Sequence, residues 1–139
     1  MHPLINVGLG YLKLGQSLST LSSGEAQRLK LASFLSEEIE NSILIFDEPT
    51  KGLHFHDIEI LIKAFQKLID NKNTIIAIEH NLDIIKNADW IIELGPEAGP
   101  DGGEIMFSGK KSEFINTKNH TAKELIREFN YAKTVDNNS

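Results

Sequence analysis

The sequence contains no cysteine, which excludes disulfide bonds, thiolate zinc sites and iron–sulfur clusters among its 139 residues. Long apolar runs are also missing. The longest runs, at residues 43–46 and 75–78, are far too short to span a membrane. The first residues lack the basic start and apolar core of a signal peptide, so we expect a soluble, cytoplasmic protein.

An excess of basic residues is absent as well. The chain has 14 Lys and Arg against 20 Asp and Glu, which gives a net charge of −6. This balance argues against a domain that coats nucleic acid or an anionic membrane with basic surface, although it leaves room for a small local DNA contact. The hydrophobic fraction of 40% and the charged fraction of 24% are typical of a globular domain.

Apolar runs of strand length alternate with segments of helical period along the chain. Residues 43–46, 74–78 and 90–94 are expected to be strands, the first two buried on both faces. Helices are expected at residues 25–39 and 57–70. Strands separated by helices require crossover connections, so the sequence predicts a single α/β domain over residues 1–139 with a mainly parallel sheet.

The end of the chain is expected to form a small α+β tail. Glycine and proline crowd residues 95–103, which predicts a loop, and a short strand at 104–108 and a turn at Gly109 should follow. Thr121 and Glu124 have the spacing of a capping box, which predicts a helix over residues 122–129.

The first segment whose residues could bind a ligand is residues 21–28, of sequence LSSGEAQR. Small residues at a helix N-terminus let backbone amides and a serine hydroxyl approach a phosphate, which the helix dipole also favours. Ser22 and Glu25 also have the spacing of a simple capping box. Taken alone, this segment favours the capping box, because capping boxes are common.

The second segment joins an apolar strand to two adjacent acids, Asp47 and Glu48. Ligands of open α/β folds bind at the carboxyl ends of parallel strands, which is where these carboxylates should lie. An aspartate there can hold Mg²⁺, and the neighbouring glutamate can polarise an attacking water. A strand that merely ends in an acidic turn is the alternative.

Two histidine-containing segments complete the set. Residues 49–54, of sequence PTKGLH, follow the two acids, and Glu79 and His80 follow the strand at 74–78. An imidazole at the end of a strand can hydrogen-bond a phosphate or orient a water, although a lone histidine there is more often structural. His54, His56 and Asp57 are a weaker candidate for a metal site, because nothing in the sequence marks a residue that would orient them.

Together, the order and spacing of these segments resemble an ABC-type ATPase, with its signature motif, Walker B strand, D-loop and switch histidine. The details are similar to the second ATPase domain of the UvrA family of excinuclease ABC proteins, which recognise DNA damage in bacterial nucleotide excision repair. The resemblance covers about residues 5–115, through strings at residues 7–16, 21–32, 47–54, 78–83, 94–97 and 101–103. Residues 51–54 and the glycine-rich loop at 95–103 disfavour a transporter ATPase.

The resemblance implies a role for each matching residue. Asp47 would be the Mg²⁺-associated acid, Glu48 the general base or water-orienting residue, and His80 the switch histidine near the γ-phosphate. The signature, which in this superfamily contacts the γ-phosphate held by the opposite ATPase half, would comprise Ser22, Ser23, Gly24 and Glu25. Ser23 stands where the family usually has glycine, and its side chain would either crowd the phosphate or add a hydrogen bond.

The sequence contains no complete P-loop. Residues 10–17, of sequence GYLKLGQS, have the glycine spacing of a P-loop, but Gln16 stands where the phosphate-binding lysine is required. The resemblance therefore implies a partial P-loop ATPase domain without the P-loop strand. We expect the P-loop, the Q-loop and the cysteine zinc module of the family to lie N-terminal to Met1.

The leading hypothesis is a C-terminal ATPase segment of a UvrA-like repair protein that is inactive alone. It would use ATP and Mg²⁺ in the complete protein, with the rest of the ATPase or a second copy as partner, and DNA and other excision-repair proteins as further partners. The alternative is a non-catalytic interaction module that docks on a full-length relative or a repair partner.

The missing P-loop strand has a structural consequence. It normally lies between the strands expected here at residues 74–78 and 90–94, and its absence would leave two unpaired edges. Three outcomes are open: the two strands pair directly, residues 4–7 fill the gap, or a second copy supplies a strand. Self-association is favoured, because an unpaired apolar edge is a template for another chain.

Overall fold

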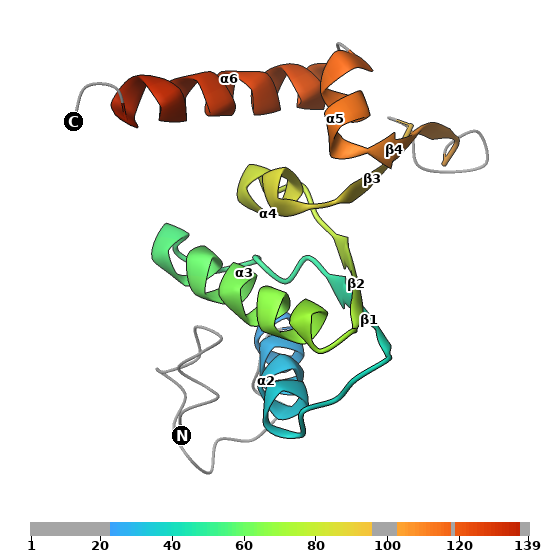
Figure 1. The fold of residues 1–139 in the computed structure, drawn as a ribbon, viewed down its shortest axis with the longest axis vertical. Coiled ribbons are helices and arrows are strands. Elements are labelled where there is room, and N and C mark those ends of the chain that lie inside the picture. Colours follow the sequence, from blue (N-terminus) through green and yellow to red (C-terminus); the bar gives the residue numbers. More distant parts are fainter. Residues whose placement is uncertain (1–22, 96–102, 118, 137–139) are drawn as a thin grey trace. The chain divides into compact units, whose positions relative to one another are not determined.

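The computed structural model describes residues 23–95, 103–117 and 119–136, and the side chains of residues 24–130 within them. The chain divides into two compact units, Met1–Ile84 and Ile85–Ser139, each of which is described by itself. The elements are mixed helices and strands, with one small parallel sheet and one small antiparallel sheet (Figure 1). No helix within the described ranges is long and apolar enough to cross a membrane.

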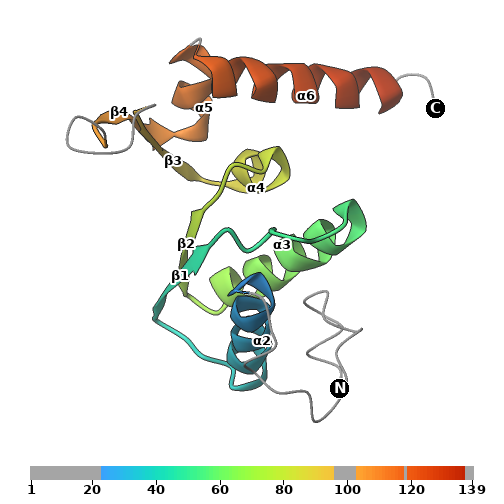
Figure 2. The same cartoon turned by 180° about the vertical axis from the view of Figure 1, so that it is seen from behind.

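The first unit is built on two parallel strands joined by a helix. Helix α2 (Ser23–Ser36) precedes strand β1 (Ile43–Asp47), and helix α3 (Phe55–Asp70) connects β1 to strand β2 (Thr74–Ile78). β1 and β2 pair in parallel, from Ile43 opposite Thr74 to Asp47 opposite Ile78. Figures 1 and 2 show the two strands side by side, with α2 and α3 close to them. The parallel pair and its helical crossover were expected from the sequence.

The core of this unit lies between the helices and one face of the strand pair. On β1 the side chains of Leu44 and Phe46 are buried, and the Phe46 ring lies 5.0 Å from that of Phe65 on α3. The core contains apolar side chains from α2, β1, α3 and the start of α4 (Leu82–Asn87), which are Leu31, Ala32, Leu44, Phe46, Ile58, Leu61, Ala64, Phe65, Leu68 and Ile84.

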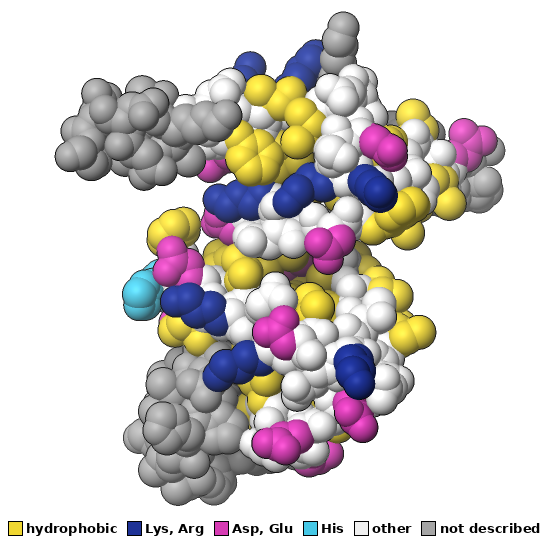
Figure 3. Space-filling model, in the orientation of Figure 1, with side chains coloured by type: hydrophobic (Ala, Val, Ile, Leu, Met, Phe, Trp, Pro, Cys, Tyr) yellow, Lys and Arg dark blue, Asp and Glu magenta, His cyan; other side chains and the backbone are white. Residues whose placement is uncertain are grey.

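The other face of the strand pair is exposed. Ile43 and Ile45 on β1 expose 68% and 66% of their surface, and Ile76 and Ile78 on β2 are exposed as well. Hydrophobic side chains are visible on the surface beside these strands in Figure 3. The prediction that these strands are buried on both faces is therefore wrong in this structure, because the helices pack on one face only.

The second unit contains an antiparallel strand pair and two helices. Strand β3 (Trp90–Leu94) pairs with strand β4 (Ile105–Lys110), with an irregularity between Glu93 and Leu94. Helix α5 (Lys111–Phe114), the 3₁₀ turn η2 (Ile115–Thr117) and helix α6 (His120–Asp136) follow. Phe114, Ala122 and Leu125 are buried, and the ring of Phe114 lies 5.1 Å from that of Phe107 on β4.

Two sequence expectations for this unit are wrong in detail. Gly109 is not a turn residue but a buried position inside β4, which continues to Lys110. Helix α6 begins at His120 rather than Ala122, because Asn119 caps it by accepting the backbone N–H of Ala122 at 2.7 Å. The predicted capping box at Thr121 therefore does not start the helix.

The sequence predicts a gap between β2 and β3, where the P-loop strand of the family would lie. Within the described residues β2 pairs with β1 inside the first unit and β3 pairs with β4 inside the second. Direct pairing of β2 with β3 stays a prediction, because the two strands belong to different units. Residues 4–7, which could fill the gap, lie outside the described residues. Pairing with a second copy stays a prediction.

Candidate functional site

The candidate site is formed by the turns that follow β1 and β2. The two strands are parallel and Asp47 lies opposite Ile78, so Glu48 and the pair Glu79–His80 emerge at the same edge of the sheet. The backbone N–H of Glu48 continues the ladder by donating to the carbonyl of Ile78 at 2.9 Å. This edge is the place where open α/β folds bind ligands.

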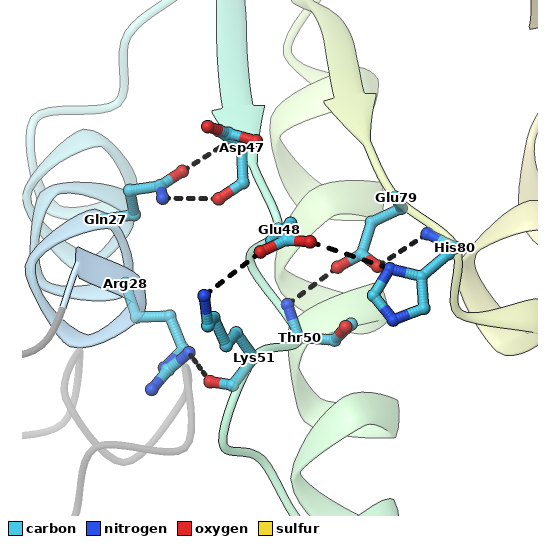
Figure 4. Close-up of polar contacts among 8 residues, drawn as sticks. All are labelled: Gln27, Arg28, Asp47, Glu48, Thr50, Lys51, Glu79 and His80. Carbon is cyan, nitrogen blue, oxygen red and sulfur yellow. Dashed lines mark hydrogen bonds and ion pairs between the residues drawn. The ribbon is translucent and has the colours of Figure 1, made fainter. Parts of the chain in front are cut away.

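Glu48 and His80 approach each other at this edge. The Nδ1 atom of His80 lies 3.8 Å from one carboxylate oxygen of Glu48, and the Nζ atom of Lys51 lies 3.3 Å from the other (Figure 4). The side chain of His80 is 85% exposed and that of Glu48 is 41% exposed, so both can meet a ligand from solvent. A partly exposed carboxylate beside an imidazole can accept a proton from water or orient it.

Glu48 has an unusual backbone conformation. Its φ angle is +46°, in the left-handed region that residues with a side chain rarely adopt. Such a conformation costs of the order of 1–3 kcal/mol and persists only where the surrounding structure holds it. The turn after β1 therefore presents the Glu48 carboxylate in a geometry that other contacts must maintain.

Asp47 differs from Glu48 in its surroundings. Its backbone is bound by the side chain of Gln27 on α2, which accepts the Asp47 N–H at 2.7 Å and donates to the Asp47 carbonyl at 2.5 Å (Figure 4). These contacts engage the main chain, and the Asp47 side chain is exposed at the end of β1. Its carboxylate is thus open to a cation that approaches the edge.

The described residues contain no group of three or more His, Asp or Glu side chains that could hold a metal ion. The structure therefore does not gather His54, His56 and Asp57 into the weaker metal site considered from the sequence. A single carboxylate such as Asp47 nevertheless fits Mg²⁺, which commonly binds one or two protein carboxylates together with substrate phosphates and water.

The signature segment is described in part. Ser22 lies outside the described residues, and Ser23 is the first residue of α2. Gly24 is buried where α2 meets the turn after β1: a Cβ atom there would lie 3.2 Å from the carbonyl oxygen of Lys51. Glu25 follows in the first turn of α2 and is half-buried.

Three further residues at this site lie in the segments named from the sequence but were given no role there. Gln27 holds Asp47, as described above. Arg28 is only 2% exposed and donates through Nη1 to the carbonyls of Pro49 and Lys51. The Glu79 carboxylate accepts the backbone N–H of Thr50, in the turn after β1, and that of His80, after β2. All three lie inside the motif strings, but their partners are backbone atoms that a sequence does not display.

Adjacent acids at the end of one parallel strand and a histidine after the next are the arrangement expected of an ABC-type ATPase segment, a class that similar proteins support. No protein-family profile matches the chain. The UvrABC system protein A of Brucella abortus is 47% identical over 129 residues, which are 92% of this chain and 13% of that protein. The protein of the same name from Xanthomonas axonopodis pv. citri is 56% identical over 114 residues, which are 81% of this chain and 12% of that protein.

A solved structure agrees with these relatives. The crystal structure of UvrA2 from Deinococcus radiodurans has a TM-score of 0.81 and 42% identity, covering 89% of this chain and 15% of that chain. The chain is therefore homologous to a segment of the UvrA proteins, and the resemblance predicted from its motifs is confirmed. It spans about an eighth of the length of the curated relatives.

Proposed function

We propose that the chain is the C-terminal segment of the second ATPase domain of a UvrA-like nucleotide excision repair protein. In this role it supports ATP binding and hydrolysis coupled to the recognition of damaged DNA in the cytoplasm. The observation that carries the proposal is the approach of Glu48 and His80 at the carboxyl edge of the parallel strands. Homology to UvrA proteins supports the same role.

Glu48 is assigned as the general base or water-orienting residue. Its carboxylate is partly exposed and stands beside two groups that can carry positive charge, His80 and Lys51. In phosphoryl transfer the protein contributes mainly by positioning the nucleophile and stabilising charge. The carboxylate would orient a water for attack on the γ-phosphate, and His80 would hydrogen-bond the same phosphate.

Asp47 is assigned to Mg²⁺ that arrives with ATP. The metal, when bound, neutralises charge on the phosphates during transfer. Asp47 supports this assignment because its side chain is exposed while Gln27 fixes its backbone. Asp47 would hold the ion directly or through a water.

Ser22, Ser23, Gly24 and Glu25 are assigned as the signature that contacts the γ-phosphate held by an opposite ATPase half. Burial of Gly24 against the Lys51 carbonyl supports a close approach of this segment to the turn after β1. The P-loop that would cradle the phosphates of the segment's own nucleotide would be supplied by the remainder of the ATPase. DNA and other excision-repair proteins are the partners of that complete assembly.

The test compares two proteins. The first is the 139-residue chain alone, which should not hydrolyse ATP at a useful rate, because positioning of the phosphates supplies most of the catalysis. The second is a chimaera in which this chain replaces the matching segment of the Deinococcus radiodurans UvrA2, which should hydrolyse ATP. Steady turnover by the isolated chain that Glu48→Gln abolishes would contradict the proposal. A well-folded chimaera that binds no ATP would instead favour the interaction module.

A further inference from the structure

The turn that follows β1 is held from two sides by charged side chains. From α2, Arg28 donates through Nη1 to the carbonyl of Pro49 at 2.8 Å and to that of Lys51 at 3.3 Å. From the end of β2, Glu79 accepts the backbone N–H of Thr50 at 2.8 Å. Three consecutive residues of the turn are therefore each bonded to a side chain of another element. Figure 4 shows the bonds of Thr50 and Lys51.

The second carboxylate oxygen of Glu79 reaches the other turn of the site. It accepts the backbone N–H of His80 at 3.1 Å and that of Asn81 at 3.3 Å. One carboxylate thus joins the turn that carries Glu48 to the loop that carries His80. Hydrogen bonds to an ionised acceptor are stronger than those between neutral groups, so this link is well suited to fix geometry.

Arg28 links the turn after β1 to helix α2, as Glu79 links it to the loop after β2. Its side chain is almost completely buried, and its Nε atom has no hydrogen-bond partner among the described residues. Burying a cation without full compensation is costly, which indicates that the two carbonyl contacts are specific rather than incidental. Gly24, one helical turn earlier on α2, packs close enough to the Lys51 carbonyl that a Cβ atom would be tight.

The conformation of Glu48 explains why such links are needed. Its left-handed backbone is disfavoured for a residue with a side chain and requires support from its surroundings. The local bonds, from Glu48 N–H to Ile78 and from Lys51 N–H to the Glu48 carbonyl, hold the backbone of the residue itself. They do not connect its turn to α2 or to the loop after β2.

We propose that Arg28 and Glu79 are positioning residues that form a turn clamp, with residues 49–51 held between them. The clamp keeps the carboxylate of Glu48 toward His80 and transmits a displacement of α2 to both. The inference rests on the proposed roles of Glu48 and His80 in ATP hydrolysis. It adds a mechanical link by which contact at the signature alters the hydrolytic residues.

The first test is independent of nucleotide. Amide hydrogen exchange of the 139-residue chain, followed by NMR, is compared with that of Glu79→Gln and of the control Glu59→Gln, an exposed glutamate of α3. Loss of the bond from Thr50 to an ionised acceptor should speed exchange of the Thr50 amide about tenfold or more. The Asn73 amide, bonded to Leu68 in the core of the unit, should keep its protection in all variants.

Two results would overturn the clamp. One is Thr50 exchange that is unchanged in Glu79→Gln. The other is uniform loss of protection throughout the first unit, both in this variant and in the shorter but still charged Glu79→Asp, because that would assign Glu79 to overall stability. Neither result depends on ATP hydrolysis, so failure of the clamp is distinguishable from failure of the proposed function.

The second test asks whether the clamp acts on catalysis. In the UvrA2 chimaera, Glu79→Gln and Arg28→Lys should each lower kcat about ten- to hundredfold through misplacement of Glu48, with little change in KM for ATP. Glu59→Gln should leave both constants unchanged. A rise in KM with kcat unchanged would contradict a positioning role.

Discussion

At the scale of single residues, Asn73 is the buried polar side chain that joins three segments of the first unit. Its amide nitrogen donates to the carbonyls of Ile39 and Leu68, both at 2.8 Å, and its oxygen accepts the backbone N–H of Ser42 at 3.1 Å. Asn73, which directly precedes β2, thus joins the end of α3 to the segment that leads into β1.

We expect Asn73→Ala to lower the free energy of unfolding by about 2–3 kcal/mol, because it leaves buried backbone groups without partners. Urea denaturation followed by circular dichroism measures the change. Asn71→Ala, at an exposed position two residues earlier, is the matched control and should stay within about 0.5 kcal/mol of the parent. Equal effects of the two substitutions would contradict the role of Asn73.

Substitutions of Asp47 and Glu48 should have different effects on nucleotide binding. In the chimaera with UvrA2, Asp47→Asn should weaken Mg²⁺-dependent ATP binding, because it removes the charged metal ligand. Glu48→Gln should leave binding close to that of the parent, because the amide keeps the shape of the side chain. Titration with ATP in the presence and absence of Mg²⁺ tests this separation, and equal loss of binding in both variants would refute it.

At the scale of elements, β4 shows how tightly the second unit is packed. A Cβ atom on Gly109 would lie 2.8 Å from a carboxylate oxygen of Glu113 and 2.9 Å from the ring of Phe107. That ring packs on Phe114, so it cannot move aside without disturbing the buried end of α5.

We therefore expect Gly109→Ala to destabilise this unit by about 1–3 kcal/mol, as overpacked substitutions do. Thermal unfolding of the chain measures the effect. Gly103, which has no atom within 4 Å of an added Cβ, provides a contrasting position, although its positive φ adds strain there. If Gly109→Ala were as stable as the parent or more stable, the space beside Gly109 would accommodate a Cβ atom and the expectation would be wrong.

The elements also show what the sequence can and cannot predict. β2 was predicted to the residue, because its apolar run is bounded by polar residues on both sides, and the shared edge of Glu48 and His80 follows from parallel pairing. The exposed face of β1 was not predicted, since burial depends on which helices pack where. The roles of Arg28 and Glu79 were not predicted for a similar reason: their side chains bind backbone atoms of distant segments.

At the scale of the whole molecule, the strand pairs leave edges and apolar surface open within the described residues. β1 with β2 forms a two-stranded sheet in the first unit and β3 with β4 forms another in the second, so within its own unit each of these strands has one unpaired edge. Exposed isoleucines on β1 and β2 add an apolar face. Proteins seldom leave such edges open.

Self-association of the isolated chain stays the expected consequence. Light scattering across a range of concentrations should give a mass above the 15.5 kDa of one chain. Ile45→Lys places a charge on the exposed face of β1 and should shift the chain toward the monomer while leaving the core unchanged. A monomer at every concentration would refute the expectation.

The central claim is that Glu48 and His80 form the hydrolytic edge of a UvrA-like ATPase segment. It is tested most directly by the ATP turnover of the chimaera with UvrA2, with and without Glu48→Gln. We predict that this substitution lowers kcat by about a hundredfold or more, the range expected for loss of a general base. Turnover that is unchanged by Glu48→Gln, in a chimaera that hydrolyses ATP, would contradict the account.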